Sequence, residues 1–158
     1  MTYAIRAAGE RDIPDLLRLL TQVNMVHHAG RPDLFKGPAT KYGAFELKAL
    51  LSDARSPVFV CAEEGGAVLG YAFCALKQVK NSALLTDILT LYVDDLCVDE
   101  NCRSQGIGKA LYRHVLSFAR AAGCYNVTLN VWAFNESAIR FYESCGMRPQ
   151  KIGMEAIL

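Results

Sequence analysis

Residues 103–111, "RSQGIGKAL", combine two glycines and two cations at the predicted start of a helix. Glycine inside a helix costs about 0.5–1 kcal/mol relative to alanine, so two glycines in three residues need a reason. One reason is an anion site, because the missing Cβ atoms of Gly106 and Gly108 let a phosphate approach unpaired N–H groups beside Arg103 and Lys109. The other is a tight turn in which Gly106 adopts a positive φ angle.

The spacing of this segment excludes two widespread phosphate-binding motifs. A P-loop requires GxxxxGK[ST], but Lys109 is followed by Ala110 and position 103 is not a glycine. A dinucleotide-binding fingerprint requires a third glycine, where Leu111 stands, and an acid about twenty residues on, where Thr128 stands. An Arg-x-x-Gly-x-Gly pattern remains.

Two further segments carry groups that can move protons. Asp94 and Asp95 stand side by side in "LTLYVDDLCV", and neighbouring strand residues point to opposite faces, so without a bulge only one of them faces a site. Tyr142 is a phenol that stays protonated at neutral pH and can donate a proton. Its helical spacing with Ala138, Phe141 and Cys145 is also typical of core packing.

Whole-chain quantities indicate what kind of domain positions these residues. With 158 residues, 52% of them hydrophobic and 21% charged, the chain is expected to form one globular domain over residues 1–158. The net charge of +1 is too small to produce an overall positive electrostatic field that would attract nucleic acid. Six cysteines without a CxxC motif disfavour a metal site, and the absence of a long apolar run disfavours a membrane partner or signal peptide. We therefore expect a cytoplasmic protein with free thiols.

The hydrophobic pattern predicts ten elements in a single α+β or α/β domain with a mixed sheet. The predicted helices run from Asp12 to about Val26, from Tyr42 to Leu51, from Gly106 to Gly123 and from Asn135 to Cys145. The predicted strands are Tyr3–Ala7, Val58–Ala62, Val68–Leu76, Leu89–Val98, residues 125–132 and Arg148–Leu158.

Residues 103–108 resemble the pyrophosphate loop of the GNAT superfamily of acetyl-CoA-dependent N-acetyltransferases. Residues 135–147, "NESAIRFYESCGM", resemble the next block of that family, in which an Asn opens a short helix and Phe-Tyr precedes a Gly. The two blocks also have the family's usual separation. The resemblance implies a single GNAT-like domain with a mixed, mostly antiparallel sheet, a splayed parallel strand pair and about four flanking helices.

The resemblance also implies that acetyl-CoA is the cosubstrate, with no metal. The pantetheine arm is expected in the gap between the splayed strands, against the backbone of Leu96, Cys97 and Val98. The pyrophosphate is expected beside Arg103 and within a cradle formed by Ser104, Gln105, Gly106, Ile107, Gly108 and Lys109. Asn135 is expected to cap the last helix near the cofactor arm, and Tyr142 matches the family's Phe-Tyr and is expected to protonate the leaving thiolate.

The strand "LYVDDLCV" resembles that of polyamine acetyltransferases, in which an acidic pair precedes the pantetheine-binding residues. By this resemblance an acid binds or deprotonates a cationic amine, with Asp94 preferred over Asp95; a solvated aspartate at a strand kink is the alternative. The loop between the family's first two helices lines the acceptor site, so Phe35 and His28 are expected to contact substrate. Alternatively, Phe35 covers the core and His28 serves as a cation at a helix C-terminus.

We therefore predict direct acetyl transfer from acetyl-CoA to a primary amine in a ternary complex, with a small cationic acceptor preferred. Peptide N-termini and protein lysines are alternative acceptors, because one fold serves many functions. A noncatalytic acyl-CoA-binding module is the alternative of another class. A homodimer formed through the apolar segment "IGMEAIL" is a further option.

Overall fold

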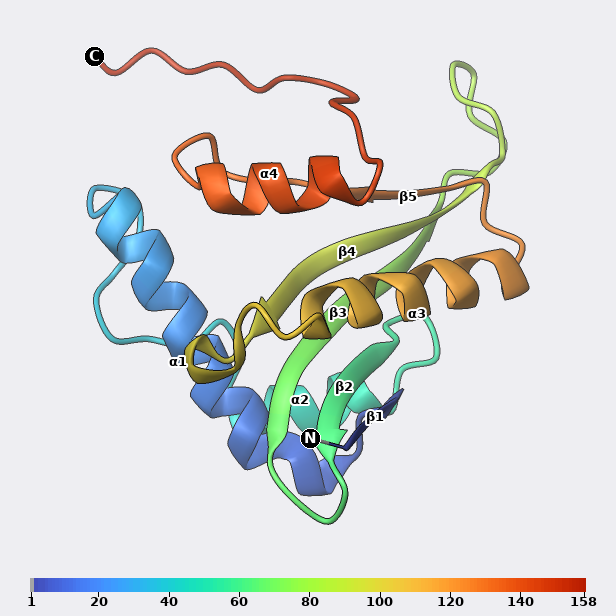
Figure 1. The fold of residues 1–158 in the computed structure, drawn as a ribbon. Helices are drawn as coiled ribbons and strands as arrows, with labels where there is room; N and C mark the ends of the chain where they lie inside the picture. The colour runs from blue at the N-terminus through green and yellow to red at the C-terminus, as the bar shows by residue number, and fades with distance from the viewer. Residues whose placement is uncertain (1) are drawn as a thin grey trace.

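The computed structural model describes residues 2–158, and a five-stranded sheet organises them (Figure 1). The strands lie in sequence order across the sheet, antiparallel from the first to the fourth, with the fifth parallel to the fourth. The mixed, mostly antiparallel sheet of the sequence analysis is thus confirmed. The strands are β1 (Tyr3–Ala7), β2 (Val58–Glu63), β3 (Val68–Gln78), β4 (Leu89–Val98) and β5 (Asn126–Leu129).

Within residues 2–158, four α-helices and two short 3-10 helices flank the sheet, in agreement with the expected number of about four. Figure 1 shows α3 lying across the sheet and α4 beside β5. The helices are α1 (Ile13–Gly30), α2 (Ala44–Leu51), α3 (Ile107–Ala121) and α4 (Glu136–Ser144), with η1 (Glu10–Asp12) and η2 (Glu100–Cys102). In the described part of the chain, no helix combines the length and the apolar character that crossing a bilayer requires.

The two faces of the sheet bury different clusters of apolar side chains. Tyr71 and Phe73 on β3 pack with leucines of α1 and α2, whereas Ala72 and Cys74 pack with Val115 of α3. This alternation follows the two-residue period of a strand. The sheet is therefore covered by α1 and α2 on one face and by α3 on the other.

The predicted last strand is wrong. Residues 147–158 belong to no strand or helix, and the segment extends past α4 and away from the sheet (Figure 1). Ile152, Met154, Ile157 and Leu158 are almost fully exposed. The alternating apolar residues match a strand pattern, but a strand also needs a neighbouring edge to pair with, and this segment pairs with none of the described residues.

The sheet changes its geometry at Asp94. Phe73 lies opposite Asp95 while Cys74 lies opposite Val93, so Asp94 is an extra residue on β4 and forms a β-bulge. The pairing of β4 with β5 covers only Thr90–Val93 against Asn126–Leu129. The two parallel strands therefore separate at the bulge. This is the splayed parallel strand pair that the sequence resemblance implies.

Candidate active site

The loop from β4 to α3 contains two residues with left-handed backbone conformations. Ser104 has φ +63° and Gly106 has φ +80°, while a Cβ added at Gly106 would meet no atom within 4 Å. Gly106 is therefore required by its backbone angle and not by crowding. Closely spaced left-handed residues turn successive N–H groups toward one side, which is how backbone concavities bind anions.

The start of α3 leaves backbone N–H groups available to a ligand. Gly106 has no side chain to cap the helix, and the first helical bond runs from Ala110 N–H to the Gly106 carbonyl at 3.0 Å. The N–H groups of residues 107–109 consequently have no carbonyl one turn earlier. Arg103 and Lys109 are exposed beside them. The end of the helix dipole and the two cations suit an anion such as a pyrophosphate.

Gly108 serves a different purpose from Gly106. A Cβ at Gly108 would lie 3.2 Å from the Phe141 ring and 3.6 Å from Val98. The missing side chain thus lets Phe141 of α4 pack directly on the start of α3, while the buried Ile107 anchors that start in the core. Because Tyr142 follows Phe141, with ring centroids 5.2 Å apart, this contact also positions Tyr142.

Beyond Val93 the outer edge of β4 is no longer paired with β5. Asp99 donates its N–H to the Leu69 carbonyl of β3 at 2.8 Å, and residues along an antiparallel strand alternate in the side they face. Leu96 and Val98 therefore direct their backbone groups away from β3, toward the gap, although the Val98 carbonyl already accepts a hydrogen bond from the Gln22 amide. The backbone groups of Cys97 face β3 instead. Its thiol is buried, and burial raises the pKa of that thiol to about 12. Of the three predicted pantetheine contacts, Leu96 and Val98 present their backbone to the gap and Cys97 does not.

The bulge brings both aspartates to the face covered by α1 and α2. Leu91 and Val93 pack toward α3 before the bulge, and Leu96 does so after it, which leaves Asp94 and Asp95 together on the other face. The sequence analysis expected one aspartate at the site unless a bulge intervened, and the structure contains that bulge.

Asp94 is held by two residues from the segment between α1 and α2. Lys41 Nζ lies 2.6 Å from Asp94 Oδ2, and the Tyr42 hydroxyl donates to the same oxygen at 3.3 Å. Burial alone would lower the pKa of Lys41, but the Asp94 carboxylate outweighs it and the net pKa is raised. Lys41 is therefore an ammonium at neutral pH.

Asp95 is in a different environment. Its carboxylate accepts a hydrogen bond from the Tyr71 hydroxyl at 2.6 Å. Burial, opposed by that hydrogen bond and reinforced by Asp94, raises the pKa of Asp95 to about 6. A carboxylate with a pKa near neutrality is suited to accept and release protons.

Tyr142 lies near Asp95. Burial, then the nearby Asp95 carboxylate and Cys145, raise the pKa of Tyr142 far above its ordinary value. None of the described residues forms a hydrogen bond with its hydroxyl. Tyr142 is thus a neutral phenol with a free donor at any physiological pH. The same helix begins at Asn135, whose side chain accepts from the Ala138 N–H at 3.3 Å, so the predicted cap is confirmed.

The residues predicted to contact substrate from the first loop have packing roles in the structure. Phe35 lies between His27 and Trp132, with ring centroids 4.9 and 5.3 Å away. His28 Nδ1 lies 2.7 Å from the Phe35 carbonyl oxygen. Both residues therefore tie the start of the segment after α1 to the end of that helix, and Phe35 also packs on Trp132.

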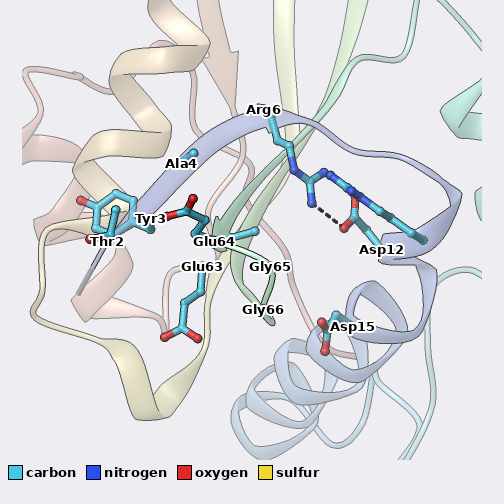
Figure 2. Close-up of a pocket in the computed structure, with 12 residues that line it drawn as sticks. Thr2, Tyr3, Ala4, Arg6, Asp12, Asp15, Glu63, Glu64, Gly65 and Gly66 are labelled. Carbon is cyan, nitrogen blue, oxygen red and sulfur yellow. Dashed lines mark hydrogen bonds and ion pairs between the residues drawn. The ribbon is translucent and has the colours of Figure 1, made fainter.

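A small groove opens beside Asp94. It encloses about 170 Å³ and is lined by Tyr42, Phe73, Lys77, Tyr92 and Asp94 among others. A larger pocket of about 480 Å³ lies elsewhere, around β1 and the β2–β3 turn, and Figure 2 shows the Arg6–Asp12 pair in it. None of the predicted site residues lines that larger pocket.

Several residues that organise this region could not be found from the sequence pattern. Lys41, Tyr42 and Tyr71 contact the aspartates through pairings that no local pattern signals. Gln22 of α1 donates to the Val98 carbonyl at 3.3 Å and so ties α1 to the end of β4.

Comparisons with known proteins agree with this geometry. The acetyltransferase (GNAT) family model matches residues 3–147, and the chain belongs to that family. An uncharacterized N-acetyltransferase of Methanocaldococcus jannaschii is 26% identical over 151 residues, which is 96% of this chain and 63% of that protein. N-acetyltransferase 8 of Mus musculus is 40% identical over 106 residues, or 67% of this chain and 44% of that protein. The chain thus spans less than two thirds of either relative.

A solved structure is similar over nearly the whole chain. The tetramutant of the BH1408 protein from Bacillus halodurans has a TM-score of 0.93 and 34% identity, covering 98% of this chain and 99% of that one. The fold and the five-stranded sheet described above are therefore shared with a crystallographically determined protein.

Proposed function

We propose that this chain transfers an acetyl group from acetyl-CoA to a primary amine in a ternary complex. The observation that carries the proposal is the meeting of three features at one point. The free edge of β4, the acidic pair Asp94–Asp95 and the phenol of Tyr142 all lie where β4 and β5 part. The anion-binding start of α3 follows β4 directly, so one segment of chain supplies both the cradle and the reaction centre.

The proposal gives each side chain a separate task. Acetyl-CoA supplies the activated acyl group. Residues 103–109 hold its pyrophosphate, and the backbone of Leu96 and Val98 orients its pantetheine arm and supplies N–H donors for charge that develops on the carbonyl oxygen. Asp95 takes the proton of the amine, supported by its pKa of about 6. Tyr142 donates its proton to the departing thiolate, supported by its free hydroxyl.

A small cationic amine is the proposed acceptor. Asp94 supplies a carboxylate for an ammonium group, and Tyr42 and Phe73 in the adjoining groove supply aromatic faces that attract cations. The Tyr92 ring in that groove is already covered by Lys77, whose Nζ lies 3.9 Å from the ring centre. The volume of about 170 Å³ is well below the roughly 300–1,000 Å³ of ordinary ligand clefts. Both features favour a small amine over a peptide N-terminus or a protein lysine, which remain the alternatives.

Two further proposals concern the setting of this activity. All six cysteines are unpaired, which supports a reducing, cytoplasmic environment. The exposed apolar side chains of residues 148–158 support association into a homodimer.

Initial rates with a panel of amines test the proposed acceptor. We expect 1,4-diaminobutane to be acetylated more efficiently than a peptide N-terminus or a lysine peptide. Asp94→Asn should raise the KM for the diamine at least about tenfold, the loss of about 1.4 kcal/mol, with the KM for acetyl-CoA unchanged. Glu64→Gln, which removes an exposed carboxylate from the remote β2–β3 turn, is the matched control.

The same assay separates catalysis from mere binding. Acetyl-CoA binding without acetylation of any amine would favour a noncatalytic acyl-CoA-binding module. An unchanged diamine KM in Asp94→Asn would remove Asp94 from the acceptor site and leave the acetyl transfer itself in place.

A further inference from the structure

Lys41 places a primary amine of the chain itself where the proposed acceptor amine would be held. Its Nζ lies 2.6 Å from Asp94 Oδ2 and 5.6 Å from the centre of the Tyr42 ring. Asp94 is the bulge residue at which β4 and β5 part. The ammonium group thus has the carboxylate and the aromatic neighbour that the proposed acceptor site offers to a small amine.

The surroundings of Lys41 allow it to reach the gap. It belongs to residues 31–43, which contain no helix or strand, and its side chain is about half exposed. The titratable groups around it are Asp94, Asp95, Tyr42 and His27. Burial and then the Lys41 charge lower the pKa of His27, so His27 is neutral at pH 7 and adds no competing cation.

Other lysines provide a contrast within the same molecule. Lys36 belongs to the same irregular segment, and Lys48 lies on α2 and pairs with Glu10 at 3.9 Å. Neither is paired with the acidic residues at the bulge. A general reactivity of exposed lysines would affect all three, whereas pairing with Asp94 at the proposed reaction centre would affect Lys41 and not Lys36 or Lys48.

We propose that Lys41 is a modification site, acetylated on Nζ by the reaction centre of its own chain. The inference rests on the proposed function, because it uses the same acetyl donor and the same side chains. On this proposal, the segment between α1 and α2 both lines the acceptor site and supplies a substrate to it.

The step balances without any oxidant or reductant. The Lys41 ammonium first loses a proton through the acidic pair to water. The neutral amine then forms an N–C bond with the acetyl carbonyl carbon while the C–S bond of acetyl-CoA breaks, and the second nitrogen proton also leaves. The thiolate takes one proton from Tyr142, and the second nitrogen proton restores the Tyr142 phenol by way of water. The products are therefore acetyl-lysine, CoA and one proton released to solvent. The amide carries no charge, so the ion pair with Asp94 is lost.

Peptide mass spectrometry of the full chain incubated with acetyl-CoA tests the inference. We expect acetylation of Lys41 at least about tenfold faster than that of Lys36 and Lys48, with a first-order rate that does not change on dilution of the protein. Asp94→Asn and Tyr142→Phe should each slow Lys41 acetylation at least about tenfold and leave the slow acetylation of Lys36 and Lys48 unchanged. Glu64→Gln should change none of the rates.

Three results would overturn the inference. Acetylation of Lys41 no faster than that of Lys36 and Lys48, in protein that acetylates free amines, would reject Lys41 as a target and leave the proposed function in place. A Lys41 rate proportional to protein concentration would reject transfer within one chain. Absence of acetylation of both free amines and Lys41 would reject the inference and the proposed function together.

Discussion

At the scale of single residues, the proposed site depends on two partly buried oxygen acids, to which we assign opposite tasks. Tyr142 keeps its proton because burial and the neighbouring Asp95 oppose ionisation. Burial, reinforced by Asp94, raises the pKa of Asp95 to about 6, although the Tyr71 hydrogen bond, the Lys41 charge and the Leu96 N–H lower it. Tyr142 and Asp95 thus provide a proton donor and a proton acceptor at the same pH.

Replacement of Tyr142 by Phe should lower kcat by about 10²-fold, the lower end of the usual range for loss of a proton donor. The ring and its packing on α4 are retained, so acetyl-CoA affinity and the melting temperature should change little. Steady-state kinetics with a calorimetric binding control checks this. An unchanged kcat would exclude Tyr142 as the donor.

The pKa of Asp95 predicts a link between activity, stability and pH. The folded value of about 6 lies above the unfolded value of about 3.9, so the ionised carboxylate destabilises the fold, and stability falls as the pH rises from about 4 to 6. Asp95→Asn should therefore raise the free energy of unfolding at pH 7.5 by about 1–3 kcal/mol. It should also slow turnover and abolish the rise of kcat/KM near pH 6.

Urea unfolding of wild type and Asp95→Asn at pH 4.5 and 7.5 measures the stability difference, and pH–rate profiles measure the activity. A variant less stable than wild type at pH 7.5 would show that the Asp95 carboxylate is favourable in the fold. A wild-type profile that is flat between pH 5 and 7 would exclude Asp95 as the base.

At the scale of elements, β4 and α3 act as one unit. β4 was predicted with its observed bounds, and α3 was predicted to start near Gly106, because apolar alternation and glycines mark both. The bulge at Asp94 could not be predicted, since an extra residue leaves no signature in a strand pattern. Nor could Lys41, whose partner lies 53 positions away. The strand predicted over residues 148–158 is absent from the structure. Strand formation depends on pairing with an edge from a distant part of the chain, which the local sequence does not reveal.

The left-handed angle at Gly106 predicts the effect of adding a side chain there. Gly106→Ala should lower the free energy of unfolding by about 1 kcal/mol, because φ near +80° strains any residue with a Cβ. Gly9→Ala is the matched control, since a Cβ there also meets no atom within 4 Å but its φ is −127°. Chemical denaturation compares them. Equal effects of the two substitutions would show that the loop tolerates an alanine in this conformation.

At the scale of the whole molecule, the chain divides into a packed domain and an exposed end. Within residues 148–158, Glu155 forms a surface ion pair with Arg31, and such pairs contribute little. The large apolar side chains of this segment instead face solvent, which favours a contact between copies.

Ending the chain at Arg148 should change the free energy of unfolding by less than about 1 kcal/mol and convert a dimer to a monomer. Sedimentation velocity on both proteins measures the change, with Ile152→Ser/Met154→Ser as a milder variant and Lys151→Ser as its control. A full chain that is monomeric at every concentration would contradict the proposed association, as would a shortened chain that still forms dimers.

Calorimetric titration with acetyl-CoA of the wild type and of Gly106→Glu most directly tests the acyl-CoA site on which the proposed chemistry depends. The substitution places a carboxylate where the pyrophosphate is proposed to bind. We expect the wild type to bind at micromolar or tighter affinity and the folded variant to bind at least about 100-fold more weakly, a loss of about 2.7 kcal/mol. Failure of the wild type to bind acetyl-CoA, or equal binding by both proteins, would contradict the assignment of residues 103–109 as the cofactor cradle.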